Sequence, residues 1–257
     1  MSHQHINRRS STPCPRCKRL ISINADSCIH CGLARPKIYL SIPILRDLIT
    51  GKISFVDSIV LLCLVLYVLA LLLDITGLSL IGGNILNLLR PAEESLYKLG
   101  MGGRIPLAMG RWWTMITATY LHGSILHIGF NMLWLRRIGP LVEELFGASR
   151  FWIIYTISGL FGSILTTIMG TYFFVGASGA IFGLLAGFAM LFPNTQLMLL
   201  FPPIPIKAKY FVPIIAAADL FLGLSSYQTG IAHFAHLGGA LVGFLLIINW
   251  HGLPGRR

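Results

Sequence analysis

The sequence predicts an all-α polytopic membrane protein, in which six membrane-spanning helices follow a small cysteine-rich module. The first observation behind this prediction is composition. Of the 257 residues, 55% are hydrophobic and only 11% are charged, whereas charged residues make up about 25% of a typical soluble domain. The second is a series of apolar runs of about 20 residues, the length that a helix needs to cross a bilayer. The third is the uneven distribution of basic residues between the connections.

Six apolar runs define the predicted spans, of which the fourth and fifth are short or interrupted. They cover residues 55–74, 113–135, 151–170, 177–192, 209–226 and 232–250. The segment before the first span is polar and basic, so we expect no cleavable signal peptide and an insertion directed by the first span itself. The predicted divisions are a cysteine-rich module with a flexible N-terminus at 1–40, a linker at 41–54, a membrane domain at 55–250 and a basic tail at 251–257.

The net charge of +11 would suit a nucleic-acid partner, but the placement of the charges indicates topology instead. If the N-terminus is cytoplasmic, 16 of the 20 Lys and Arg residues fall on the cytoplasmic side, and the other four lie in the first connection. This is the asymmetry of the positive-inside rule. The sequence therefore predicts six spans with both termini in the cytoplasm, the lipid bilayer as a partner, and no nucleic acid. The architecture is typical of a prokaryotic plasma (inner) membrane protein.

The cysteine-rich module carries two CxxC pairs, formed by Cys14, Cys17, Cys28 and Cys31. Two such pairs can give four thiolates to one tetrahedral zinc ion. The alternatives are two disulfides or free thiols, but a cytoplasmic location keeps thiols reduced. The module is too small for a hydrophobic core, so metal binding would supply most of its folding free energy. We therefore predict a zinc ribbon with one structural Zn²⁺. The module resembles the small zinc ribbons at the start of many prokaryotic membrane proteins, and this resemblance implies that it binds or positions a protein partner, which the sequence does not identify.

Polar residues inside the apolar runs mark a candidate site, because burying them at membrane depth is costly unless they find polar partners. Ser178 begins the fourth span, and His236 lies in the sixth. Small residues such as Gly179 and Gly239 would let these two helices approach closely. Ser178 and His236 would then lie within hydrogen-bonding distance, as an activated serine nucleophile requires. Taken alone, Ser178 would equally suit the N-cap of a helix.

The second predicted span adds further polar side chains. His127 and Asn131 are four residues apart and share one helical face. Together with the backbone amide of Ser178 at a helix N-terminus, they could donate hydrogen bonds to a developing oxyanion. A lone residue of either type would more often stabilise helix–helix packing. His122 lies further outward, and we expect it to stabilise the first connection or the mouth of this span.

No acidic residue completes a catalytic triad in this interpretation. The intramembrane acid is Asp219 in the fifth span, for which we expect a packing role, with a functional role such as gating as the alternative. The sequence therefore predicts a dyad of Ser178 and His236. The ring of His236 would be held by an aromatic side chain, and Phe182, one turn below Ser178, is the candidate. We assign His233 a structural role.

Three motifs, in this order, resemble those of the rhomboid intramembrane serine proteases. They are His122-x4-His127-x3-Asn131, Gly176-Ala177-Ser178-Gly179 and Ala235-His236-x2-Gly239-x3-Gly243. The resemblance covers about residues 55–250 and implies a six-helix bundle with a water-filled cavity open to the extracytoplasmic side. It implies that Ser178 is the nucleophile and His236 the general base, with no cofactor for catalysis. It also implies an oxyanion hole made of His127, Asn131 and the Ser178 amide.

The function that follows from this resemblance is intramembrane serine endopeptidase activity on transmembrane proteins near the extracytoplasmic membrane surface. Many rhomboid proteases carry Tyr where this chain has Phe182, so ring stacking is retained here without a phenolic hydrogen bond. The alternative is a catalytically inactive rhomboid relative that binds membrane proteins, but Ser178 and His236 are both present. A transporter would instead show internal repeats or matching broken spans, which the sequence lacks.

Overall fold

The computed structural model separates the chain into two units, one ending at Phe55 and the other beginning at Val56. It describes residues 11–14, 17, 19–22, 25–32, 54–75, 88–171, 173–198, 203–225 and 229–251. Apart from one residue each, the predicted linker and the predicted basic tail lie outside the described residues. So do residues 1–10 and 33–40 of the predicted cysteine-rich module.

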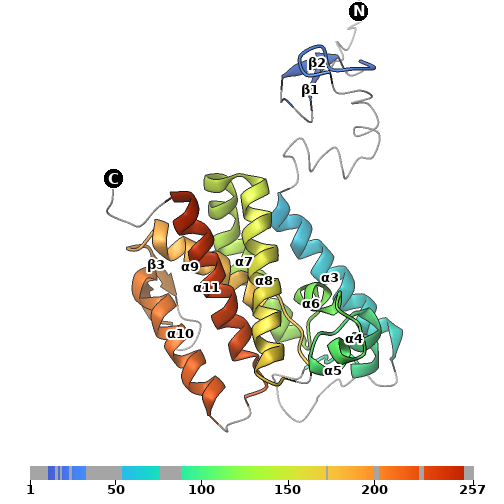
Figure 1. Cartoon of the computed structure of the whole chain (residues 1–257), viewed down its shortest axis with the longest axis vertical. Helices are drawn as coiled ribbons and strands as arrows, with labels where there is room; N and C mark the ends of the chain where they lie inside the picture. Colours follow the sequence, from blue (N-terminus) through green and yellow to red (C-terminus); the bar gives the residue numbers. More distant parts are fainter. Residues whose placement is uncertain are drawn as a thin grey trace, which may run out of the picture. The chain divides into compact units, whose positions relative to one another are not determined.

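The N-terminal unit contains a short antiparallel hairpin (Figure 1). Its strands are β1 (Ser11–Pro13) and β2 (Leu20–Ser22). Ile21 on β2 packs with the buried side chains of Cys14 and Cys28, and Cys17 and Cys31 lie against the same cluster. A core this small supports the expectation that the unit depends on its cysteines for stability.

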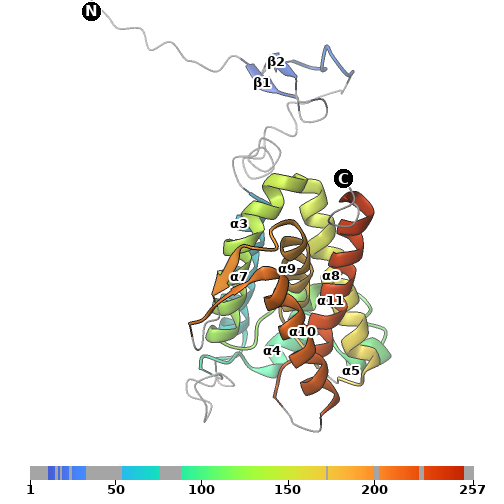
Figure 2. The ribbon, with the colours of Figure 1, turned by 90° about the vertical axis from the view of Figure 1, so that its left-hand side faces the viewer.

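The second unit is a bundle of helices, seen from two sides in Figures 1 and 2. Its main helices are α3 (Phe55–Leu73), α7 (Ile125–Phe146), α8 (Ala148–Ile168), α9 (Ser178–Leu191), α10 (Ala208–Leu224) and α11 (His233–His251). By length and composition, α3, α8 and residues His233–Trp250 of α11 could each cross a membrane, and α9 is a shorter apolar helix. Leu61, Leu72 and Phe221 are exposed on the surface of the bundle, as suits side chains that face lipid.

Five of the six predicted spans coincide with helices to within a few residues, but the second span was placed wrongly. The sequence predicts this span at 113–135, whereas α7 begins only at Ile125. The chain turns before that point, and Ser124 caps α7 by accepting a hydrogen bond from the backbone N–H of His127 at 3.2 Å. At its other end α7 continues past Arg136 to Phe146. The predicted span ends where the apolar run meets the first charged residues, but a helix can continue through charged residues, as α7 does here.

Two connections between the main helices carry structure of their own. The first contains α4 (Glu93–Leu99), α5 (Arg104–Ala108), α6 (Thr114–Thr117) and the 3₁₀ turn η2 (Ala118–Tyr120), and the connection before α10 contains the hairpin of β3 (Gln196–Met198) and β4 (Pro205–Lys207). Arg111 fastens the first connection. Its Nη2 donates to the carbonyl oxygen of Tyr97 at 2.8 Å, and its guanidinium lies 4.2 Å from the centre of the Tyr97 ring.

Helix α9 is the most enclosed helix of the bundle, and it contacts α7, α8, α10 and α11 (Figure 2). Ten of its 14 residues are buried. Glycines set its distance from α11, as the sequence predicts. A Cβ added at Gly239 would collide with the carbonyl oxygen of Gly179, and one at Gly243 with that of Gly183. The two backbones are therefore in direct contact below the first residue of α9.

Candidate active site

Ser178 and His236 are brought together by this close packing. The Oγ of Ser178 lies 2.9 Å from Nε2 of His236. Ser178 is the first residue of α9, and the N-cap position belongs to Ala177, with no side-chain capping bond. The alternative reading of Ser178 as a helix cap is therefore wrong. Its hydroxyl faces an imidazole at the end of a helix where backbone N–H groups have no partner within the helix.

The ring of His236 lies flat on the ring of Phe182. Their centroids are 4.2 Å apart and their planes differ by 4°. Phe182 is one helical turn below Ser178 on α9, so a single helix carries both the hydroxyl and the ring that face His236. This is the contact that the sequence predicts, and it restricts any tilt of the imidazole out of its plane.

Asp219, on α10, also reaches His236. Both of its carboxylate oxygens lie 3.1 Å from Nδ1 of His236, and the residue is only 5% exposed. The expectation that no carboxylate contacts His236 is therefore wrong, and the pair is extended to Ser178–His236–Asp219. The sequence shows that α10 carries an acid, but periodicity alone does not show which neighbour that acid faces. The signal in the sequence that could have indicated this contact is the cost of burying an unpaired acid within a membrane span.

The same carboxylate contacts a second imidazole. Nδ1 of His233 lies 2.6 Å from Oδ1 of Asp219, and Nε2 of His233 lies 2.7 Å from Oγ1 of Thr229. His233, to which we assign a structural role from the sequence, thus contacts Asp219. Asp219, His233 and His236 are close enough that they could together hold a metal ion.

His127 lies beside Ser178, with Gly176 between them. Gly176 has a φ of +134°, and a Cβ there would lie 2.7 Å from Nε2 of His127 and 3.9 Å from Oγ of Ser178. Nδ1 of His127 accepts a hydrogen bond from the backbone N–H of Gly123 at 3.4 Å. In a neutral imidazole the other nitrogen then carries the proton. The Nε2–H of His127 is thereby left as a donor on the side of Ser178.

Asn131 and His122 support this part of the site. Asn131 is buried, and its Nδ2 donates to the carbonyl oxygen of His127 at 2.8 Å. His122 is fully buried and lies edge-on against His127, with ring centroids 5.2 Å apart. His122 precedes α7, so it belongs to the turn that leads into the helix and not to the helix itself. All the side chains singled out in the apolar runs, Asp219 included, lie in or around one cluster.

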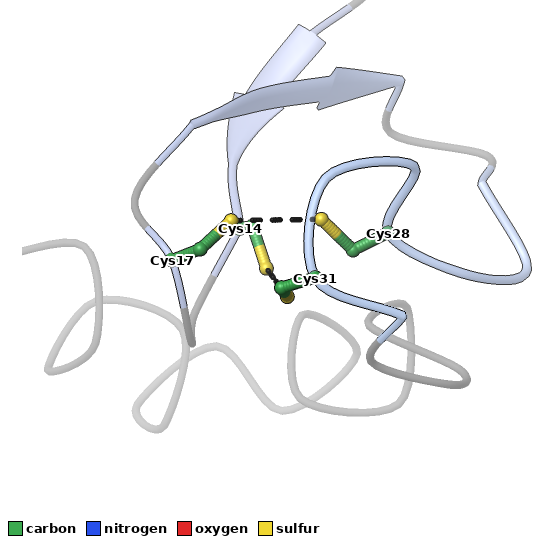
Figure 3. Close-up of side chains that lie close together, drawn as sticks. All are labelled: Cys14, Cys17, Cys28 and Cys31. Atoms are coloured by element: carbon green, nitrogen blue, oxygen red, sulfur yellow. Dashed lines mark hydrogen bonds between the residues drawn. The ribbon is translucent and has the colours of Figure 1, made fainter.

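The four cysteines of the N-terminal unit form a second, separate cluster (Figure 3). The sulfur atoms of Cys14 and Cys31 are 3.7 Å apart, and those of Cys17 and Cys28 are 3.6 Å apart. None of these four cysteines forms a disulfide, in which the sulfurs would be about 2.05 Å apart. A tetrahedral zinc with bonds of about 2.3 Å places its sulfurs about 3.8 Å apart. The donor set therefore fits one structural zinc, which would stabilise the fold of this unit.

These features define a helical membrane protein with a serine–histidine pair enclosed between its helices, and comparison with known proteins gives the family. The model of the Rhomboid domain matches residues 109–251, so the chain belongs to the rhomboid family. The match and the apolar helices together make it an integral membrane protein. The match begins after α3, and both α3 and the cysteine cluster lie outside it.

Individual relatives agree with this assignment. The chain is 33% identical over 151 residues to Rhomboid protease GluP of Bacillus subtilis (strain 168), covering 59% of this chain and 28% of that protein. It is 38% identical over 162 residues to RHOMBOID-like protein 5 of Arabidopsis thaliana, covering 62% and 50%. It is 35% identical over 149 residues to Putative rhomboid protease YdcA of Bacillus subtilis (strain 168), covering 56% and 70%. The chain thus spans half or less of the first two relatives.

Proposed function

We propose that this chain is an intramembrane serine endopeptidase that hydrolyses peptide bonds of transmembrane proteins near the extracytoplasmic membrane surface. The observation that carries the proposal is the 2.9 Å approach of Ser178 Oγ to His236 Nε2 at the N-terminus of α9. A hydroxyl is a weak nucleophile until a base accepts its proton. The protease names of two relatives support the same reaction class.

The reaction would proceed in two halves. Ser178 Oγ attacks the carbonyl carbon of the substrate while its proton passes to Nε2 of His236. The imidazolium then gives that proton to the leaving amine nitrogen as the peptide bond breaks, which leaves an acyl ester on Ser178. A water molecule, deprotonated by His236, attacks the ester. The imidazolium then returns the proton to Ser178 Oγ as the ester bond breaks, which releases the carboxylic acid and free Ser178. Each half forms one oxyanion.

The oxyanion would be stabilised by donors that surround Ser178. The backbone amides at the start of α9 have no partner within the helix and carry the positive end of its dipole. The Nε2–H of His127 faces the same space across Gly176. Because these donors are fixed before the charge develops, they lower the energy of the transition state more than that of the bound substrate.

The length of α9 supports cleavage below the membrane surface. Its 14 residues span about 21 Å, which is less than the hydrocarbon thickness of about 30 Å. In the topology predicted from the basic residues, Ser178 lies at the extracytoplasmic end of this helix. If α9 ends at the cytoplasmic surface, it begins below the outer surface and leaves room above Ser178 for water and for an unwound segment of substrate.

The proposal is tested by cleavage of a single-span substrate with the purified protein in liposomes. Wild-type protein is expected to cleave it, while Ser178→Ala and His236→Ala remain folded and fall to background. Turnover by Ser178→Ala at the wild-type rate would refute the proposed mechanism. Binding of the substrate without cleavage by wild-type protein would instead identify an inactive, substrate-binding member of the family.

A further inference from the structure

A carboxylate buried between two imidazoles is the unusual feature of this site. Asp219 is 5% exposed and His233 is 6% exposed, and a charged group at membrane depth is costly unless it is paired. Here both partners are ring nitrogens. Oδ1 of Asp219 lies 2.6 Å from Nδ1 of His233 and 3.1 Å from Nδ1 of His236. A hydrophobic side chain at position 219 would pack α10 without this cost, so the acid points to a function beyond packing.

The first consequence concerns the tautomer of His236. A carboxylate accepts hydrogen bonds and donates none. Nδ1 of His236, 3.1 Å from both oxygens of Asp219, is therefore the protonated nitrogen. Nε2 is left with its lone pair directed at the hydroxyl of Ser178. This is the tautomer that a general base for Ser178 requires.

The second consequence concerns how the carboxylate is held. The backbone N–H of Ile231 donates to Oγ1 of Thr229 at 3.1 Å, so the Thr229 hydroxyl is free to donate to Nε2 of His233. Nδ1–H of His233 then donates to Oδ1 of Asp219. His233 and His236 are three residues apart on one face of α11. One imidazole thus fixes the carboxylate that orients the other.

We propose that Asp219 is a positioning residue that fixes the tautomer and orientation of His236, and that His233 in turn holds Asp219. Thr229, His233, Asp219, His236 and Ser178 then form one continuous line of hydrogen bonds. This inference rests on the proposed function. It replaces the dyad expected from the sequence with a Ser178–His236–Asp219 arrangement, in which Phe182 and Asp219 both hold the base.

The test compares Asp219→Asn with wild-type protein by steady-state cleavage in liposomes. The Asn side chain has nearly the same shape. Because His233 donates to Oδ1, the amide oxygen should take that position and the N–H₂ the position of Oδ2, 3.1 Å from Nδ1 of His236. There the N–H₂ can only donate, which favours the tautomer of His236 with its proton on Nε2. We expect kcat to fall at least tenfold, and up to the order of 10⁴-fold seen when a triad aspartate is replaced by Asn. KM and the midpoint of thermal unfolding should stay near wild type. A loss of kcat below tenfold would overturn the proposal.

Two further variants sharpen this comparison. Asp57→Asn makes the same change at an exposed acid on α3, 3.8 Å from Arg136, and should leave kcat unchanged. His233→Phe should lower kcat by less than Asp219→Asn does, because Asp219 keeps its bond to His236. An unchanged kcat in His233→Phe would remove His233 from the proposal. If wild-type protein does not cleave, the proposed function fails. If wild-type protein cleaves and Asp219→Asn cleaves equally well, only the proposal for Asp219 fails.

Two measurements do not depend on the Asp219→Asn variant being folded and active. In ¹⁵N-histidine-labelled wild-type protein, the resonance lost in His236→Ala reports the tautomer of that ring. A proton on Nδ1 is expected, and a proton on Nε2 would overturn the proposal. Metal analysis should find one zinc per chain, lost in the Cys14→Ser/Cys17→Ser variant. A metal ion that the cysteine variant retains and the His233→Phe variant loses would show that Asp219, His233 and His236 bind a metal. That result would also overturn the proposal.

Discussion

At the scale of single residues, His236 is held in two independent ways. The ring of Phe182 lies parallel to it at 4.2 Å and limits its tilt, while the carboxylate of Asp219 at 3.1 Å limits its rotation within the plane. Either contact alone leaves one degree of freedom open. Together they direct Nε2 at Ser178, so under the proposed function the base is already oriented before a substrate binds.

Asn131→Ala tests the donors around the oxyanion. One N–H of the Asn131 amide already donates to the carbonyl oxygen of His127 at 2.8 Å, so under the oxyanion hypothesis the second N–H would be the donor to the transition state. Removing one oxyanion donor typically lowers kcat by about 10²–10³-fold, and we expect the lower end because backbone amides remain. Steady-state kinetics should show a loss in kcat larger than the rise in KM.

The matched control for this variant is Asn194→Ala, at an exposed residue in the turn after α9. It should leave both kinetic constants unchanged. If Asn131→Ala raises KM and leaves kcat at the wild-type value, Asn131 binds substrate or supports packing, and it is not part of the oxyanion hole.

At the scale of helices, the contact between α9 and α11 determines whether the site exists. Gly239→Ala would drive a Cβ into the carbonyl oxygen of Gly179, and a backbone atom cannot move aside as a flexible side chain can. Overpacking of this kind costs about 1–3 kcal/mol. We expect a lower midpoint of thermal unfolding and a loss of cleavage, because the helices that carry Ser178 and His236 must separate.

Gly129→Ala on α7 is the control, since an added Cβ there meets no atom within 4 Å. Alanine is the better helix former by about 1 kcal/mol, so the unfolding midpoint should stay the same or rise. Equal destabilisation by the two variants would contradict the account of the α9–α11 contact.

The helices also show what the sequence could and could not predict. Apolar runs located five of the spans, because a helix of that length is the main way to satisfy the backbone in a bilayer. They misplaced α7, whose start is set by a turn and a cap at Ser124. They also missed the partner of Asp219, because hydrophobic periodicity reports which residues lie in a helix and not which neighbouring helix a polar side chain faces.

In the whole molecule, the candidate zinc ligands and the candidate active site lie in different units. The match to the Rhomboid domain covers only residues 109–251, while the four sulfurs of Cys14, Cys17, Cys28 and Cys31 form their own cluster. We therefore expect the N-terminal unit to serve partner choice or regulation. Protein lacking residues 1–40 should still cleave a model substrate at a rate similar to wild type. If the truncated protein is stable and inserted in the membrane but inactive, the two units are coupled.

The activation of Ser178 is tested most directly by labelling with a fluorophosphonate probe, which reacts only with an activated serine. Intact protein in liposomes should be labelled, and mass spectrometry of the peptides should place the label on Ser178. Labelling should be absent from heat-denatured protein and from Ser178→Ala, and it should be strongly slowed in His236→Ala, in which no base accepts the serine proton. Labelling at another serine, or equal labelling of Ser178→Ala and wild-type protein, would show that Ser178 is not the activated nucleophile.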